Sequence, residues 1–147
     1  MDNKFLDLAL KYAKKAATNN EIPVGAVIVK DNKVLSYAYN KKEKNKSVLE
    51  HAELIAIKKA SKKLDNWRLN DCDIYISLDP CPMCASAIKQ ARIKNVYSAL
   101  NNSDENNLKI IENIFKKDKT NPEVNFISNL KIDESKKILN SFFKRQR

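Results

Sequence analysis

Apolar residues recur every three or four positions in several segments of the chain, which is the spacing of an amphipathic helix. In the segment 5–17 this pattern begins near Leu6 and ends at Ala17. The same spacing predicts three further helices, over 51–64, 105–117 and 132–144. A fifth helix is expected over 80–92, because Pro82 suits a first helical turn.

Shorter apolar or alternating runs predict five strands, over 24–29, 34–39, 72–78, 95–100 and 124–127. The dipeptide Asp31-Asn32 separates the first two runs and favours a tight turn, so these strands are expected to form a hairpin. The polar stretch 40–46 has no apolar anchor and is predicted to be a loop.

Strands that alternate with helices are typical of a layered α/β domain. A chain of 147 residues has the length of one ordinary domain, and it contains no internal repeat and no low-complexity linker. We therefore expect a single domain spanning residues 1–147.

The chain is strongly basic, with a formal net charge of +10. This charge points to a polyanionic partner, most simply a nucleic acid. Only four of the 28 basic residues are arginine, and lysine, asparagine and isoleucine are abundant throughout. Part of the charge therefore fits the composition of an AT-rich genome as well as it fits selection for RNA binding.

No signal peptide precedes the first helical pattern, and no apolar run approaches the roughly 18 residues of a membrane span. Three cysteines without a secretory signal argue against a disulfide framework. The expected location is the cytoplasm.

Two short motifs carry the chemistry. His51, the only histidine, stands in His51-Ala52-Glu53, and Pro80-Cys81-Pro82-Met83-Cys84 follows thirty residues later. Taken alone, the histidine would be interpreted as a structural residue. The cysteine pair alone would be interpreted as a redox pair or as part of a structural zinc site. Together they resemble the His-x-Glu and Pro-Cys-x-x-Cys signature of zinc deaminases.

The geometry of the motifs can be argued separately. His51 and Glu53 would lie about 200° apart around an ideal helix, so they can converge only beyond its N-terminal end. Cys81 and Cys84 fall in the first turn of the helix predicted over 80–92, where the positive end of the dipole favours thiolates. One nitrogen and two sulfurs supply three zinc ligands and leave a fourth position open, as in catalytic sites.

Cys72 is a competing fourth ligand, which would close the site into a structural zinc. It begins a strand of about 20 Å whose far end leads to Cys81, so a small buried thiol is the favoured interpretation. Glu53 also has an ordinary alternative, because glutamate is common in first helical turns. Beside a zinc ligand we expect it to be the catalytic residue, moving protons from the attacking water to the base and the departing amine.

The chain closely resembles the bacterial tRNA adenosine deaminases of the cytidine deaminase-like superfamily over nearly its whole length. The matching stretches are Asn20-Glu21-Ile22-Pro23-Val24-Gly25-Ala26-Val27, His51-Ala52-Glu53, Asn66-Trp67-Arg68-Leu69, Asp79-Pro80-Cys81-Pro82-Met83-Cys84 and Phe142-Phe143-Lys144-Arg145. The resemblance implies a three-layer α/β/α fold with a five-stranded mixed sheet, one zinc ion per subunit and a homodimer. It implies hydrolytic deamination of the wobble adenosine to inosine in the anticodon loop of an arginine tRNA, with release of ammonia.

The resemblance also implies three substrate contacts. Asn40 corresponds to the residue that hydrogen-bonds the target base, Ile22 to a wall of the base pocket, and the backbone of Ala52 to a group that helps hold the ring. Gly25, the sole glycine, marks either a strand bulge or a segment lying against the substrate.

The chain departs from the family in the stretch Asn101-Asn102-Ser103-Asp104-Glu105-Asn106, which lacks the usual basic run. This departure weakens the expectation of RNA contacts from that loop, as does the acidic Glu50 before the histidine. Other basic residues are candidates for phosphate contacts or for a solvated edge: Lys41, Lys42, Lys144, Arg145 and Arg147.

Two rival functions remain open. A free-base deaminase acting on guanine or cytosine shares the zinc signature. A nucleic-acid-binding module with purely structural zinc is the rival from another class.

Overall fold

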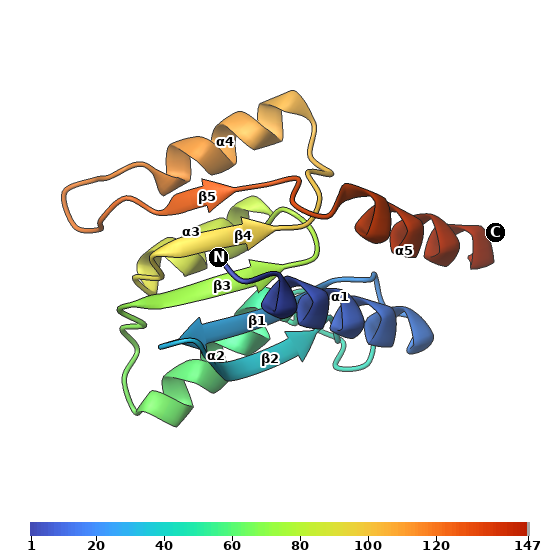
Figure 1. Cartoon of the computed structure of the whole chain (residues 1–147), viewed down its shortest axis with the longest axis horizontal. Helices are drawn as coiled ribbons and strands as arrows, with labels where there is room; N and C mark the ends of the chain where they lie inside the picture. The colour runs from blue at the N-terminus through green and yellow to red at the C-terminus, as the bar shows by residue number, and fades with distance from the viewer. Residues whose placement is uncertain (147) are drawn as a thin grey trace.

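The computed structural model describes residues 1–146, so Arg147 and its predicted phosphate contact lie outside the described residues. Within this range the chain forms five helices and five strands, which alternate except where β1 is followed directly by β2 (Figure 1). In order they are α1 (Asn3–Thr18), β1 (Gly25–Lys30), β2 (Lys33–Tyr39), α2 (Ala52–Leu64), β3 (Cys72–Ile76), α3 (Pro82–Gln90), β4 (Asn95–Ser98), α4 (Glu105–Phe115), β5 (Asn125–Ile127) and α5 (Ile132–Arg145).

The strands form one mixed sheet in the order β2-β1-β3-β4-β5. β1 pairs antiparallel with both β2 and β3, whereas β3–β4 and β4–β5 are parallel pairs. The predicted hairpin is present, with Asp31 and Asn32 in the left-handed backbone region at its turn. The parallel pair β3–β4 is joined through α3, the usual crossover for parallel strands.

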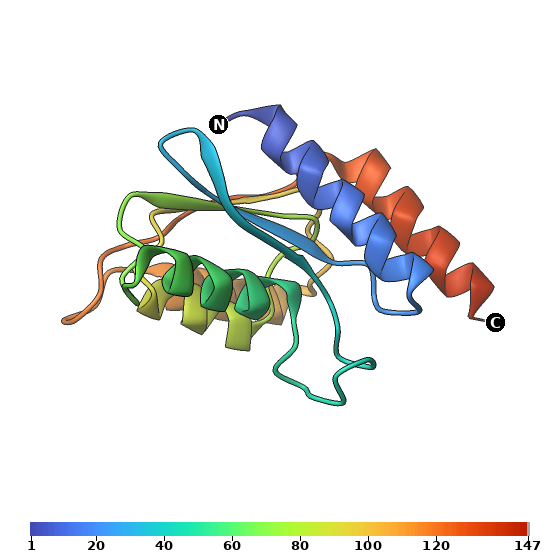
Figure 2. The ribbon, with the colours of Figure 1, turned by 90° about the horizontal axis from the view of Figure 1, so that it is seen from below.

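Helices cover both faces of the sheet (Figure 2). α1 and α5 lie side by side on one face, and α2, α3 and α4 cover the other. Alternate strand residues feed two separate cores: Ile74 and Ile76 pack toward α2–α4, while Tyr75 packs toward α1. The sheet is therefore buried on both faces, and the predicted three-layer α/β/α fold is present.

The glycine at the start of β1 serves close packing. A Cβ at Gly25 would lie 2.1 Å from the Ala9 carbonyl oxygen and 2.7 Å from the Ala13 nitrogen, both in the backbone of α1. The pairing of Gly25 with Tyr39 is regular, and the register shift of this pair occurs between Ile28 and Val29. The expectation of a bulge at Gly25 was wrong, because the close approach of a helix is what excludes a side chain there.

Helix and strand ends differ from the predictions by a few residues. β3 ends at Ile76, two residues before the predicted end, and the chain then bends while the Asp79 N–H donates to the Leu100 carbonyl. α3 is Pro82–Gln90, shorter than the predicted 80–92. Within residues 1–146, no helix combines the length and the apolar character that a membrane crossing needs.

Candidate metal and catalytic site

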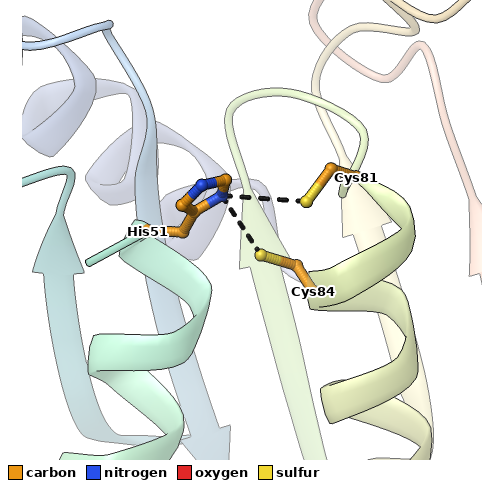
Figure 3. A group of neighbouring side chains, drawn as sticks. All are labelled: His51, Cys81 and Cys84. Atoms are coloured by element: carbon orange, nitrogen blue, oxygen red, sulfur yellow. Dashed lines mark hydrogen bonds between the residues drawn. The ribbon is translucent and has the colours of Figure 1, made fainter. Parts of the chain in front are cut away.

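The two motifs meet because α2 and α3 begin beside each other (Figure 3). His51 is the N-cap of α2 and Cys81 the N-cap of α3, and both residues have extended backbone geometry. His51 therefore precedes its helix, contrary to the prediction that the helix begins there, so the 200° helical separation from Glu53 does not apply. Neither side chain is recorded as a helix cap, and instead the His51 imidazole and the Cys81 thiol face each other and Cys84.

The three expected ligands converge on one point. Nδ1 of His51 lies 3.7 Å from Sγ of Cys81 and 3.4 Å from Sγ of Cys84. A tetrahedral zinc with bonds of about 2.0–2.1 Å to nitrogen and 2.3 Å to sulfur places such a pair about 3.6 Å apart. The observed distances fit that arrangement, so the donor set suits a zinc ion without rearrangement.

The site has three protein ligands and is not closed by a fourth. Within residues 1–146, the group able to hold a metal consists of His51, Cys81 and Cys84, whose ligand atoms lie within 4.8 Å of one another. Cys72 is buried at the start of β3, where its thiol contacts the Asn70 carbonyl at 3.7 Å. Burial raises the pKa of the Cys72 thiol to about 11, so it is a neutral core side chain, as predicted.

The beginning of α3 favours a thiolate at Cys81. The hydrogen bond donated by the Cys84 thiol is the largest cause that lowers the pKa of Cys81 to about 5. Backbone N–H groups of Met83 and Cys84 also lower it, whereas burial acts in the opposite direction. The pKa of Cys84 is raised, first because its thiol donates this bond and second because it is buried. A soft divalent ion replaces the shared proton most readily at such a pair.

Glu53 is buried in the first turn of α2, with 3% of its surface exposed. Burial is the main cause that raises the pKa of its carboxyl to about 7. Its side chain contacts the Cys84 thiol, and among the described residues its Oε1 has no hydrogen-bond partner. A buried polar atom without a partner is costly, and here it lies beside the metal ligands, where a substrate or water would satisfy it.

Of the three residues predicted to hold the base, Asn40 is bonded to Ala52, which follows the ligand His51 in the chain, and Asn40 and Ile22 line one pocket. Asn40 is buried, and its Oδ1 accepts the Ala52 N–H at 2.7 Å, which joins it to the residue after His51. The Ala52 N–H is therefore already engaged, while Nδ2 of Asn40 has no partner among the described residues. Ile22 is 46% exposed and lines the same pocket as Asn40.

A pocket of about 430 Å³ adjoins Asn40. Its walls come from the segment after α1, the loop after β2 and the end of α5: Asn20, Glu21, Ile22, Asn40, Lys42, Glu43, Phe142 and Gln146. The predicted phosphate contacts occupy two places. Lys42 lines this pocket beside Lys41, whose amine lies over the Tyr39 ring, whereas Lys144 and Arg145 line a groove between α1 and α5.

Sequence reasoning did not single out Glu21, or Lys14 and Lys137 in the groove between α1 and α5. Glu21 appeared only as one letter of a matching stretch. No local pattern indicates its role, because its partners lie 22 and 23 positions further along the chain. Lys14 and Lys137 sit on different helices and meet only through packing.

Comparison with known proteins agrees with this geometry. Residues 1–100 match the family described as the cytidine and deoxycytidylate deaminase zinc-binding region. A tRNA-specific adenosine deaminase of Aquifex aeolicus is 35% identical over 143 residues, which are 97% of this chain and 94% of that protein.

Two solved structures share both fold and substantial sequence. One comes from a study of A-to-I editing by tRNA:A34 deaminases at the wobble position of transfer RNA. It superimposes with a TM-score of 0.86 at 33% identity and covers 94% of this chain and 100% of that chain. The other is a guanine deaminase from Bacillus subtilis, with a TM-score of 0.68 at 30% identity over 98% of this chain and 95% of that chain.

The matched region contains the whole metal site, and zinc is bound by His51, Cys81 and Cys84. The family match covers most of the chain, and the adenosine deaminase relative aligns from end to end. The chain therefore belongs to the zinc-dependent cytidine and deoxycytidylate deaminase family and, within it, to the tRNA-specific adenosine deaminases.

Proposed function

We propose that this enzyme removes the 6-amino group of adenosine 34 in the anticodon loop of a tRNA, consuming water and giving inosine and ammonia. The observation that carries the proposal is the unpartnered, buried carboxylate oxygen of Glu53 beside a three-ligand metal site. A purely structural zinc would need a fourth protein ligand and would give this carboxylate no task. The rival of a binding module with structural zinc is therefore disfavoured.

Glu53 has the position for the proton transfers of hydrolytic deamination. When bound, zinc supplies a Lewis acid that makes water a competent nucleophile at neutral pH. The Glu53 carboxylate accepts a proton from the attacking water and delivers it to N1 of the adenine ring. It then takes the remaining proton from the hydroxyl group added at C6 and transfers it to the amine, so that the C6 carbonyl forms, the bond from C6 to nitrogen breaks and ammonia leaves.

The groups around the pocket suit an extruded base. Nδ2 of Asn40 can donate to a ring acceptor while Oδ1 stays bonded to Ala52. Ile22 offers an apolar wall against which an unstacked base can pack, as expected for recognition of loop nucleotides. Asn40 and Ile22 are thus our proposed direct substrate contacts, with Glu53 as the catalytic residue. The backbone of Ala52, whose N–H is bonded to Oδ1 of Asn40, is proposed to help hold the base by fixing that side chain.

Basic side chains near the pocket support an RNA substrate. Lys41 and Lys42 lie on the loop that follows Asn40, and Lys144 and Arg145 end α5 at the same side of the molecule. We propose that these side chains contact phosphates of the RNA. We also propose that the substrate is an arginine tRNA and that the enzyme acts in the cytoplasm.

We further propose that the enzyme is a homodimer. Large apolar side chains are exposed close to the metal ligands, with Val48 65%, Leu49 58% and Met83 37% exposed. A second subunit covering them would remove this apolar surface from water. Sedimentation analysis at micromolar concentration tests this point, since a purely monomeric protein would contradict it.

A free-base deaminase acting on guanine is the second candidate, favoured by the resemblance to the Bacillus subtilis protein and by the acidic character of the loop 101–106. In this loop Asp104 caps α4 by accepting the Asn107 N–H, so its carboxylate is used for the fold. The substrate assay below separates the two candidates.

The decisive experiment offers the zinc-loaded enzyme an arginine-tRNA anticodon stem-loop with adenosine at position 34. The matched control is the same stem-loop with guanosine at that position, and free guanine, cytosine and adenosine complete the series. We expect inosine in nuclease digests of the first RNA, with one ammonia released for each inosine formed. Rapid ammonia release from guanine or cytosine, with no inosine in the RNA, would refute the tRNA assignment.

A further inference from the structure

A buried carboxylate that takes no part in the proposed chemistry lies beneath the loop that carries Lys41 and Lys42. Glu21 is 2% exposed, and each of its carboxylate oxygens accepts one backbone N–H. Oε1 accepts the Glu43 N–H and Oε2 the Lys44 N–H, both at 2.9 Å. Among the described residues Glu21 forms no ion pair, so these two amides are the groups that compensate its burial.

The backbone of Glu21 is itself fixed by the end of α1. Asn20 adopts the left-handed conformation with φ 59°, and its N–H donates to the Ala17 carbonyl at 3.1 Å. The Glu21 N–H donates to the Ala16 carbonyl at 3.0 Å. This pair of bonds is a Schellman motif, which ends the helix and aims the following residue in a defined direction. The backbone of Glu21 is therefore held in place by the end of α1.

The loop that it holds joins two parts of the active site. Residues 41–50 connect Asn40, the proposed base contact, to the zinc ligand His51. The Lys41 N–H donates to the Glu50 carbonyl at 3.0 Å and closes the neck of the loop. The loop has no helix or strand of its own, so apart from this neck and its internal turns, the two bonds from Glu21 tie it to the body of the protein.

We propose that Glu21 is a positioning residue for RNA binding: its carboxylate holds loop 41–50 against the end of α1, so that Lys42 and Asn40 keep one wall of the substrate pocket in place. This inference rests on the proposed function. Glu21 and Lys42 line the same pocket, so a loop that moves away opens that wall directly. None of the three zinc ligands lies within loop 41–50 or is bonded to Glu21, so we expect zinc binding to survive the loss of these bonds.

Replacement by glutamine separates positioning from electrostatics. In Glu21→Gln the side-chain oxygen still accepts one N–H, but the amide NH₂ faces the other N–H and leaves two buried donors opposed. Loss of a hydrogen bond to a charged group weakens an interaction about tenfold or more. Removing a negative charge beside a polyanion acts in the opposite direction and would tighten RNA binding. The two explanations therefore predict effects of opposite sign.

The experiment compares the zinc-loaded wild type, Glu21→Gln and the control Glu112→Gln, which removes an exposed carboxylate on α4. Steady-state kinetics on the adenosine-34 stem-loop give KM and kcat, metal analysis gives the zinc content, and hydrogen exchange reports the Glu43 and Lys44 amides. For Glu21→Gln we expect KM to rise about tenfold or more, kcat to change less than threefold and zinc to stay equimolar. The two amides should exchange at least tenfold faster, while α1 amides are unchanged.

An unchanged or lower KM for Glu21→Gln would overturn the inference, and so would unchanged exchange at both amides. A loss of zinc would also overturn it. So would a fall of kcat accompanied by faster exchange throughout the sheet, because that result would show a general structural role. If the wild type leaves the RNA unchanged, the proposed function fails together with the RNA part of this inference. The exchange of the two amides is measured without substrate and decides the loop contact independently.

Discussion

At the scale of single residues, the site uses positions that normally stabilise helix ends. Serine, threonine, asparagine and aspartate are preferred as N-caps because their side chains bond the free N–H groups of the first turn. Here His51 and Cys81 occupy the N-caps of α2 and α3 without such bonds. Glu53, in the first turn of α2, buries a carboxylate oxygen that has no hydrogen-bond partner among the described residues. These local losses are typical of a functional site, and they are offset when metal and substrate bind.

Glu53→Gln keeps the shape of the side chain and removes its ability to accept and return a proton. We expect it to retain one zinc per chain, because Glu53 is not among the three ligands, and to lower kcat by at least about 100-fold. Single-turnover inosine formation and metal analysis on the same preparation check this. Wild-type turnover in the variant would remove Glu53 from the mechanism.

Cys72→Ala tests the three-ligand count. We expect full zinc content and normal turnover, with a loss of roughly 1 kcal/mol in the free energy of unfolding from the lost packing of a buried sulfur. Cys84→Ala is the matched change at a ligand, and we expect it to abolish stoichiometric zinc binding. Zinc titration of both variants and urea unfolding of Cys72→Ala are the measurements. Metal loss in Cys72→Ala would contradict the site described above.

At the scale of elements, the position of α1 controls more than its own packing. Its inner face is rich in alanine, including the buried Ala9, Ala13 and Ala16, which lets the helix lie close to β1. The same helix ends in the motif that aims Glu21 at the loop 41–50. A shift of α1 away from the sheet would therefore move Glu21, and with it one wall of the pocket.

Gly25→Ala is the substitution that forces such a shift. Because the atoms nearest to the added Cβ belong to the backbone of α1, no change of rotamer can relieve the contact. We expect a loss of about 1–3 kcal/mol in the free energy of unfolding, measured by urea denaturation. Lys33→Ala, on the exposed start of β2, is the control and should change stability by less than about 0.5 kcal/mol. Equal stability of the two variants would show that α1 adjusts without cost.

At the scale of the whole molecule, basic groups gather in the groove between α1 and α5. Its walls carry Lys14, Lys137, Lys144 and Arg145. The one carboxylate lining the groove, that of Glu134, pairs with Lys131 at 3.4 Å. The ends of both helices also reach the segments that form the proposed substrate pocket. We propose that this continuity gives the phosphate backbone of an RNA a path beyond the target nucleotide.

Joint substitution of Lys144 and Arg145 by alanine tests this path. Each lost phosphate contact on single-stranded RNA should reduce the slope of log affinity against log salt by about 0.7. We expect a reduction of roughly 1.4 and weaker binding at low salt. Fluorescence titration of the stem-loop between about 50 and 200 mM salt measures both. Lys62→Ala with Lys63→Ala removes the same charge at the end of α2 remote from the zinc, and should leave the slope unchanged. Equal slopes for the two double variants would place the RNA elsewhere.

The sequence by itself determined the features that depend on residues close together in the chain. Apolar spacing located nine of the ten elements within residues 1–146, since helices and strands impose their own periods on neighbouring residues, and Pro82 indicated the start of α3. The ligand set His51, Cys81 and Cys84 was predictable because metal chemistry restricts both residue type and spacing.

Only the tertiary structure decided what depends on contacts between distant positions. No periodic pattern in the sequence indicates three of these features. They are the backbone geometry of His51 as an N-cap, the helix packed over Gly25, and the bonds from Glu21 to the loop 41–50. Such contacts form when folded elements meet, and a single residue can serve several neighbours at that point. The pattern of the chain thus predicts the elements and the metal, whereas packing between elements shapes the pocket that we propose binds the substrate.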